Sequence, residues 1–139
     1  MKWIALILVF YTSTISQYRL VYQSQDEGKV TAMLKVLESK TSLTSDELCY
    51  KAVFQCMKAE YVYNPYQKLN SFKKGYSTLN NLISKNATNV EYKYHRYMIE
   101  KHTPSWLMDV NHMAADKAYV KANLKTNHPM YSFITKTID

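Results

Sequence analysis

The residues best suited to chemistry lie in one short stretch, EYKYHRYMIEKH, at positions 91–102. Glu91 and His95 are four residues apart, a spacing that brings two side chains into contact on a helix, and His102 continues the same stripe. A carboxylate beside an imidazole could act as a general base with its orienting group. The sequence ties no nucleophile or third ligand to this pair, and His95 and His102 lie about 10.5 Å apart along a helix, too far to share one metal ion. We therefore favour a hydrogen-bonded structural pair and assign no catalytic residue.

A second candidate is formed by Asp109, His112 and Asp116, which repeat at intervals of three and four. On a helix these side chains would share one face and could hold a metal ion through oxygen and nitrogen ligands. Such a set is common by chance in a charged helix, so we favour solvated residues or an ion pair and assign no metal and no cofactor. The motifs HExxH, CxxC, GxSxG and the phosphate-binding glycine loop do not occur.

The two cysteines, Cys49 and Cys56, are seven residues apart in a segment expected to be helical. That spacing separates them by about 10.5 Å along the axis, whereas a disulfide needs Cα atoms within ~7 Å. We predict two small core residues. A reactive thiol or an intermolecular disulfide is the alternative.

The N-terminal stretch MKWIALILVFYTSTISQ has the layout of a secretory signal peptide. One lysine precedes a short apolar run, and small residues at Thr14 and Ser16 suit cleavage after Ser16. The run is shorter than the ~20 residues of a membrane-spanning helix. We predict a signal peptide at 1–16, a single domain at 17–139 and export to a periplasmic or extracellular location. An uncleaved anchor is the alternative.

The composition is that of a folded basic protein, with 47% hydrophobic residues and a formal net charge of +7. Nucleic acid is not the expected partner, because export argues against it and only Arg19 and Arg96 offer the guanidinium group that favours phosphate. The scattered lysines indicate a solvated basic surface, with anionic membrane or polysaccharide contact as the minority interpretation.

With only 2 glycines and 3 prolines, the chain is predicted to be all-α. Apolar spacing indicates about five helices, at 18–38, 46–63, 66–85, 90–102 and 104–125. The fifth helix is expected to begin as a short turn and to re-form near Asn111. The tail, 126–139, has no helical stripe and is expected to be extended or loose.

Local signals set several boundaries. Thr44 and Glu47 form a capping box before the second helix. Thr103 is expected to cap the fifth helix, with Pro104 at its first position. Gly75 lies inside the third helix, where glycine costs about 1 kcal/mol relative to alanine, so we expect a neighbouring helix to approach closely there.

The tyrosines of the fourth helix occupy two opposite faces. Tyr94 and Tyr97 fall on one side and Tyr92 on the other when residues are placed at ~100° intervals. A helix that is apolar on two sides packs between two neighbours, so these tyrosines are predicted to be packing residues.

The order of several segments resembles an uncharacterised family of small exported bacterial proteins with tetratricopeptide-like helices. The segments are CYKA, MKAEYVYNPYQKLNSFKKG, NATNVEYKYHRYMIEKHTPSWL and DKAYV, which span about Cys49 to Leu124. The resemblance implies a helical-hairpin fold and export, and it implies no activity. It also marks Arg96 and Asp116, from which we predict an ion pair between the fourth and fifth helices. Two departures are NAT before the fourth helix and a longer tail.

Three functions are consistent with the sequence. We favour a non-enzymatic exported module that binds a protein or peptide, because paired helices present concave faces. The alternatives are a small hydrolase that uses a metal or His95, and a basic protein that adheres to anionic membrane or polysaccharide.

Overall fold

The computed structural model describes residues 15–139, and within this range all regular structure is helical. The all-α prediction is confirmed. The predicted signal peptide lies almost entirely outside the described residues. The helices are α2 (Ile15–Ser24), α3 (Glu27–Ser39), α4 (Ser45–Tyr61), α5 (Pro65–Lys85), α6 (Val90–Lys101), the short 3-10 helix η1 (Ser105–Leu107), α7 (Met113–Asn123) and α8 (Tyr131–Thr137).

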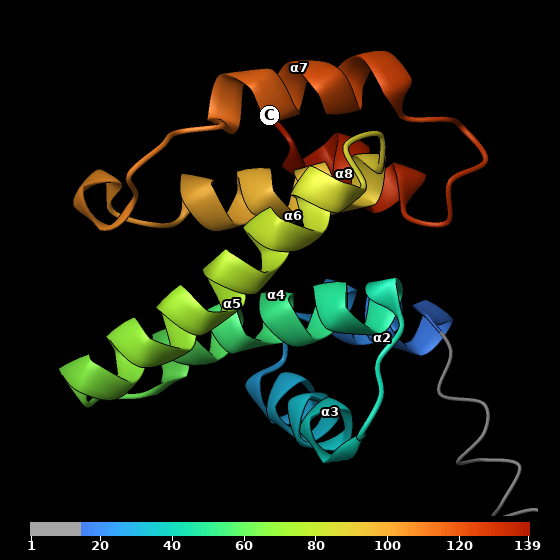
Figure 1. The fold of residues 1–139 in the computed structure, drawn as a ribbon. Helices are drawn as coiled ribbons and strands as arrows, with labels where there is room; N and C mark the ends of the chain where they lie inside the picture. Colours follow the sequence, from blue (N-terminus) through green and yellow to red (C-terminus); the bar gives the residue numbers. More distant parts are fainter. Residues whose placement is uncertain (1–14) are drawn as a thin grey trace, which may run out of the picture.

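Helices α4 and α5 form an antiparallel hairpin, which Figure 1 shows in green. The Asn64 side chain accepts hydrogen bonds from the backbone of Tyr66 and Gln67, and Pro65 occupies the first helical position of α5. Gly75 allows the close approach predicted from the sequence, because a Cβ atom there would lie 2.4 Å from the carbonyl oxygen of Ala52. The capping box of Thr44 and Glu47 is also present at the start of α4.

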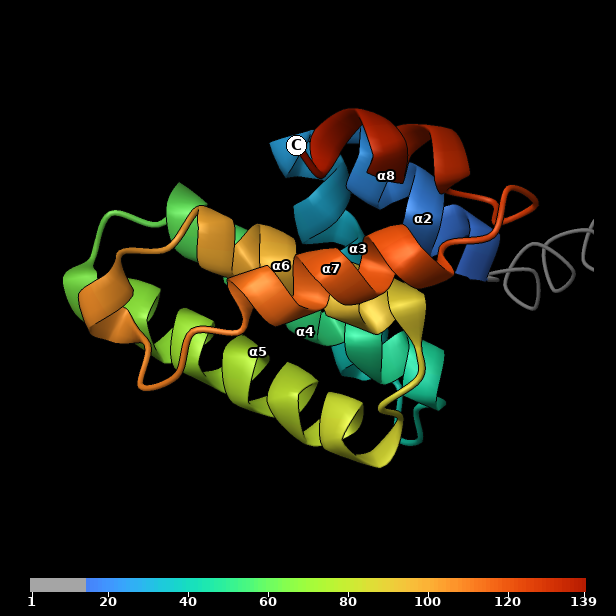
Figure 2. The ribbon, with the colours of Figure 1, turned by 90° about the horizontal axis from the view of Figure 1, so that it is seen from above.

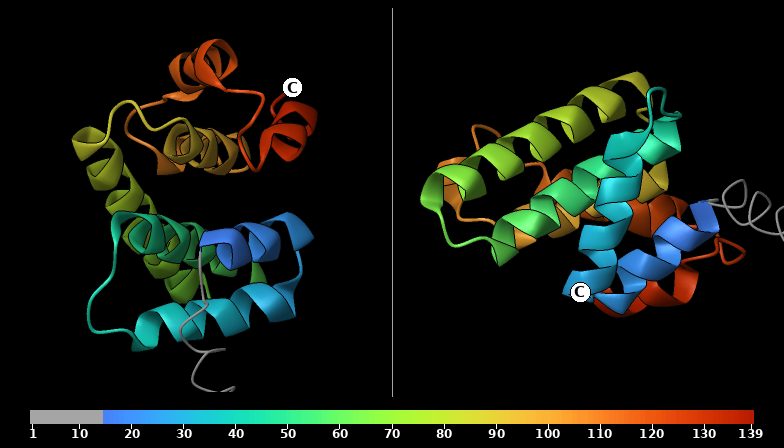
Figure 3. Two further views of the ribbon diagram at one scale, coloured as in Figure 1. Left: turned by 90° about the vertical axis from the view of Figure 1, so that its right-hand side faces the viewer. Right: turned by 90° about the horizontal axis from the view of Figure 1, so that it is seen from below.

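Helices α6, α7 and α8 lie on the opposite side of the molecule from α3 (Figures 1 and 3). Helix α5 runs obliquely between α3 and these three helices. Figure 2 shows α7 lying along α6. Tyr92, Tyr94 and Tyr97 of α6 are all buried, which confirms that these tyrosines pack inside the fold. The core also contains Tyr18, Tyr22 and other side chains from both ends of the described chain.

The helix predicted at 18–38 is instead two helices, α2 and α3. The chain turns at Gln25, which has a positive φ of 52°. The Asp26 side chain then accepts a hydrogen bond from the backbone N–H of Lys29 and begins α3. The apolar spacing after Gly28 predicts a single helix only when it is extended upstream across Gln25 and Asp26, and this pair favours a turn.

The tail at 126–139 is neither extended nor loose. It contains α8, and Met130, Ile134 and Ile138 around this helix are buried. These side chains are spaced four apart, a helical pattern that is too short to stand out in the sequence. The two halves of the first segment and α8 bring the described residues to seven α-helices, so the five-helix count is not confirmed.

The segment after α6 differs in detail from the prediction. Thr103 does not cap a helix, because its hydroxyl donates to the carbonyl of Ile99 on the preceding turn. Pro104 precedes η1 rather than beginning a long helix, and the chain re-forms α7 at Met113, close to the expected Asn111. No helix in the described range is long and apolar enough to cross a membrane.

Candidate functional site: a buried ionic cluster beside an apolar pocket

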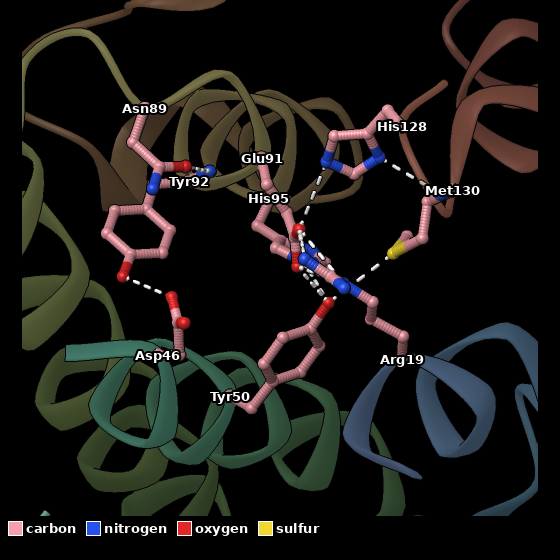
Figure 4. Close-up of polar contacts among 9 residues, drawn as sticks. All are labelled: Arg19, Asp46, Tyr50, Asn89, Glu91, Tyr92, His95, His128 and Met130. Atoms are coloured by element: carbon pink, nitrogen blue, oxygen red, sulfur yellow. Dashed lines mark hydrogen bonds and ion pairs between the residues drawn. The ribbon is translucent and has the colours of Figure 1, made fainter. Parts of the chain in front are cut away.

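Glu91 lies at the centre of a polar group that we call the Glu91 cluster: Arg19, Tyr50, Glu91, His95 and His128 (Figure 4). Tyr50, Glu91 and His95 are buried, and Arg19 and His128 are partly exposed. The Arg19 guanidinium donates to Oε1 of Glu91 from Nη2 at 2.7 Å and from Nε at 3.1 Å. The Tyr50 hydroxyl donates to Oε2, and Nε2 of His128 lies 3.2 Å from Oε1. One carboxylate therefore joins three other parts of the chain.

Four elements position these side chains. Arg19 comes from α2, Tyr50 from α4, and Glu91 from α6, while His128 precedes α8. Asn89 caps α6 by accepting a hydrogen bond from the backbone N–H of Tyr92, which places Glu91 in the first turn. A negative charge is favoured there by the helix dipole.

The charges within the cluster are well defined. Burial by itself raises the pKa of Glu91, but His95, Arg19 and the Tyr50 hydroxyl lower it, and the result is a pKa well below the usual range. Burial, together with the Glu91 charge, raises the pKa of Tyr50 far above that of a free phenol. Glu91 is therefore ionised and Tyr50 protonated near neutral pH.

These states determine which nitrogens of the two histidines carry protons. The backbone N–H of Met130 donates to Nδ1 of His128, so Nε2 of His128 bears the proton that faces Glu91. The Tyr50 proton is directed at Glu91, so the Tyr50 oxygen can only accept from Nε2 of His95, 3.2 Å away. Nδ1 of His95 is left without a hydrogen-bond partner in a side chain that is fully buried.

A pocket of about 470 Å³ lies beside the cluster, and His95 is part of its wall. Its volume falls within the ~300–1,000 Å³ typical of ligand sites. The apolar lining includes aromatic rings and methionines, and the polar residues at the pocket include Glu60 and His102. The lining residues come from α2, α4, α5, α6, α8 and the adjoining turns, and they include Tyr22, Val53, Met57, Phe72, Met98, Ile99 and Phe133.

The structure brings together only part of the predicted 91–102 stripe. Glu91 and His95 are both buried, with Nε2 of His95 3.9 Å from Oε2 of Glu91. His102 is exposed, and Nδ1 of its ring lies 2.8 Å from the carbonyl of Met98 rather than within the cluster. The two side chains do not hydrogen-bond to each other directly and are linked through the Tyr50 hydroxyl, so they belong to a larger network than the sequence predicted.

The second candidate set does not converge on one site. Asp116 accepts two hydrogen bonds from Arg96, at 2.7 and 2.8 Å, which confirms the predicted ion pair between α6 and α7. Nδ1 of His112 lies 3.0 Å from Oε1 of Glu100, and Asp109 is exposed. In residues 15–139 no group of three or more histidine, cysteine or acidic side chains is placed to hold a metal ion.

Both cysteines are buried and unpaired, as core residues. Burial raises the pKa of the Cys56 thiol to about 12 and that of Cys49 well above its usual value. Such thiols remain protonated at neutral pH and are poor nucleophiles.

Sequence reasoning missed Arg19, Tyr50 and His128. Arg19 is one of only two arginines, and a scarce arginine next to buried positions could have suggested a carboxylate partner. No pattern in the sequence links it to Glu91, because the two residues are 72 positions apart.

In comparisons with family models, with curated proteins and with solved structures, no match to this chain was found.

Proposed function

We propose that this protein is an exported, non-enzymatic helical module that binds a peptide segment of a partner protein in the pocket beside the Glu91 cluster. The layout of residues 1–16 supports export. The α4–α5 hairpin is compatible with the proposed kinship to small exported proteins with tetratricopeptide-like helices.

One observation carries the proposal of binding: the apolar pocket of about 470 Å³ framed by five helices. Its walls combine the rings of Tyr22, Phe72 and Phe133 with Met57 and Met98. Methionine side chains are flexible and polarisable, so they adapt to the shape of an apolar or aromatic anchor. The buried Glu91 cluster holds the surrounding helices in a fixed arrangement, which lowers the cost of ordering the site on binding.

The alternative of a small hydrolase has less support from this geometry. The Glu91 carboxylate already receives donors from Arg19, Tyr50 and His128, and Nε2 of His95 is bonded to Tyr50. The Cys56 thiol at the pocket is kept protonated by its burial. None of these groups is placed as an activated nucleophile with a free base.

The proposal can be tested by selecting a random peptide library displayed on phage against the purified protein. We expect enrichment of peptides that share an apolar or aromatic anchor residue. The variant Met98→Glu places a carboxylate at the pocket wall and should weaken binding of the selected peptides at least tenfold. Met33→Glu is a matched control, because Met33 is also a half-buried methionine packed on the core but does not line this pocket.

Two results would contradict the proposal. One is a selection in which no sequence pattern emerges. The other is a set of selected peptides that bind Met98→Glu and Met33→Glu equally well, because the pocket would then not be the site.

A further inference from the structure

Three strongly exposed aromatic side chains lie at one end of the molecule. Tyr63 is 97% exposed, Tyr66 84% and Trp106 80%. Tyr63 lies in the turn between α4 and α5, Tyr66 lies in the first turn of α5, and Trp106 lies in η1. Figures 1 and 2 share their horizontal direction, and both place this turn and η1 at the left-hand end. We call these three residues the aromatic end.

The fold does not need these side chains in their exposed positions. None of them belongs to the hydrophobic core, and Val110, close to Trp106 in the chain, is also 58% exposed. Single exposed apolar residues are ordinary, but several large ones at one end of a molecule mark a contact surface. Tyrosine and tryptophan are the side chains that suit a boundary between water and an apolar phase.

The chain around the aromatic end is basic. Between Tyr61 and Val90 there is no acidic residue, and the whole of α5 carries only positive charges. The segment 58–75, which contains Tyr63 and Tyr66, has a net charge of +3, and the segment 101–112, which contains Trp106, is neutral. Their charged residues are Lys58, Lys68, Lys73, Lys74, Lys101, Glu60 and Asp109.

We propose that the aromatic end docks the protein onto the surface of an anionic lipid membrane. Tryptophan and tyrosine rings settle at the level of lipid headgroups, and nearby lysines are attracted to acidic lipids. The α4–α5 turn and η1 come from separate parts of the chain but reach the same end of the molecule, which suits contact with a plane. The contact is interfacial and goes beyond the peptide site, whose pocket contains none of the three rings.

The chain has two tryptophans, Trp3 and Trp106, and the predicted cleavage after Ser16 removes Trp3, so Trp106 is the only tryptophan of the mature protein, residues 17–139. The mature protein is mixed with vesicles of phosphatidylglycerol and phosphatidylcholine, or of phosphatidylcholine alone. We expect the Trp106 emission to shift to shorter wavelength only with the anionic vesicles. Added salt should reverse the shift, because it screens the lysines.

Cosedimentation with the same vesicles identifies the residues that matter. The double variant Tyr63→Ser/Tyr66→Ser should bind anionic vesicles at least tenfold more weakly than the parent protein. Leu20→Ser is the control, because Leu20 is 66% exposed on α2, which Figure 1 places at the right-hand end, away from the aromatic end. It should bind as the parent does.

Four outcomes would overturn the proposal. The first is the absence of vesicle binding, and the second is binding that the tyrosine variant does not weaken. The third is a Trp106 shift that depends on protein concentration without vesicles, which would assign the surface to a second copy of the chain. The fourth is an equal shift with dextran sulfate, which would assign it to a polyanion rather than to a lipid surface.

Discussion

Helix α6 takes part in two arginine–carboxylate pairs whose members lie at very different separations in the sequence. In the Glu91 cluster, α6 supplies the carboxylate, and Arg19 comes from a helix 72 residues away in the sequence. In the second pair, α6 supplies Arg96, and Asp116 comes from the next α-helix, 20 residues on. The Glu91 cluster, through Arg19 and His128, connects both ends of the described chain to the centre, whereas the second pair connects neighbouring helices. The same kind of ion pair therefore joins distant parts of the chain in one place and packs neighbouring helices together in the other.

The burial of the two pairs also differs. The side chain of Glu91 is 5% exposed, and it has three donors besides the more distant His95. Asp116 is similarly buried, but among residues 15–139 Arg96 is its only charged partner within bonding distance, with Asn80 as a further partner of Arg96. Removal of Arg19 should therefore lower the free energy of unfolding more than removal of Arg96.

The largest effect is expected for Arg19→Met. This change leaves the Glu91 charge buried with no guanidinium partner, and breaking a buried ion pair on one side costs about 3–5 kcal/mol. Urea denaturation followed by circular dichroism measures the free energy of unfolding. The double variant Arg19→Met/Glu91→Met should recover part of the loss. A double variant as unstable as the sum of the two single variants would show that the pair is not coupled.

A smaller loss, about 2–3 kcal/mol, is expected for Arg96→Met, because Asp116 loses two charge-assisted hydrogen bonds. Lys93→Met is the matched control on the same helix, since the Lys93 ammonium only lies over the ring of Tyr119, 3.7 Å from its centroid. Thermal melts should show a clearly larger decrease for Arg96→Met than for Lys93→Met. Equal decreases would mean that the Arg96–Asp116 pair does not stabilise the contact between α6 and α7.

The contrast between the pairs also explains what the sequence could predict. Arg96 and Asp116 could be paired because the resemblance marks both positions, on two helices that the sequence predicts to be consecutive. Glu91 and His95 were recognised because they are one helical turn apart. Arg19 and His128 were not, since they reach Glu91 only after the chain turns at Gln25 and after α8 packs on the core. Both of these features were mispredicted, so the cluster could not be assembled from the sequence.

Tyr50→Phe tests the centre of the cluster with the smallest possible change in shape. The variant removes the hydroxyl that donates to Glu91 and accepts from His95. Leaving buried polar groups unsatisfied costs about 1–3 kcal/mol, so the loss should be below that of Arg19→Met. Tyr97→Phe is the control, since Tyr97 is also buried on the core but belongs to neither pair. If Tyr50→Phe lost no more stability than Tyr97→Phe, the Tyr50 hydroxyl would not stabilise the Glu91 cluster.

The smallest expected effect is on the pH dependence of stability, which involves the Glu91 cluster through His128 but not the Arg96–Asp116 pair. Burial lowers the pKa of His128 more strongly than the Glu91 charge raises it, and Arg19 and His95 also lower it. The folded-state pKa thus lies below the unfolded value of ~6.5. As the pH falls, the unfolded chain binds the proton first, so the stability contributed by neutral His128 is present above this window and is lost as the pH falls through it.

We therefore expect the free energy of unfolding to decrease less for His128→Gln than for the wild-type protein as the pH falls from 7 through the His128 window. The Gln amide places an N–H group near the position of Nε2 and can donate toward Glu91, so the variant removes the titration and keeps that contact. Denaturation curves at several pH values give the difference between the two proteins. The same difference should persist in the Arg96→Met background, because that pair lies outside the cluster. If the difference vanished in that background, the two arginine–carboxylate pairs would be coupled through α6, and they would not act as separate long-range and local contacts.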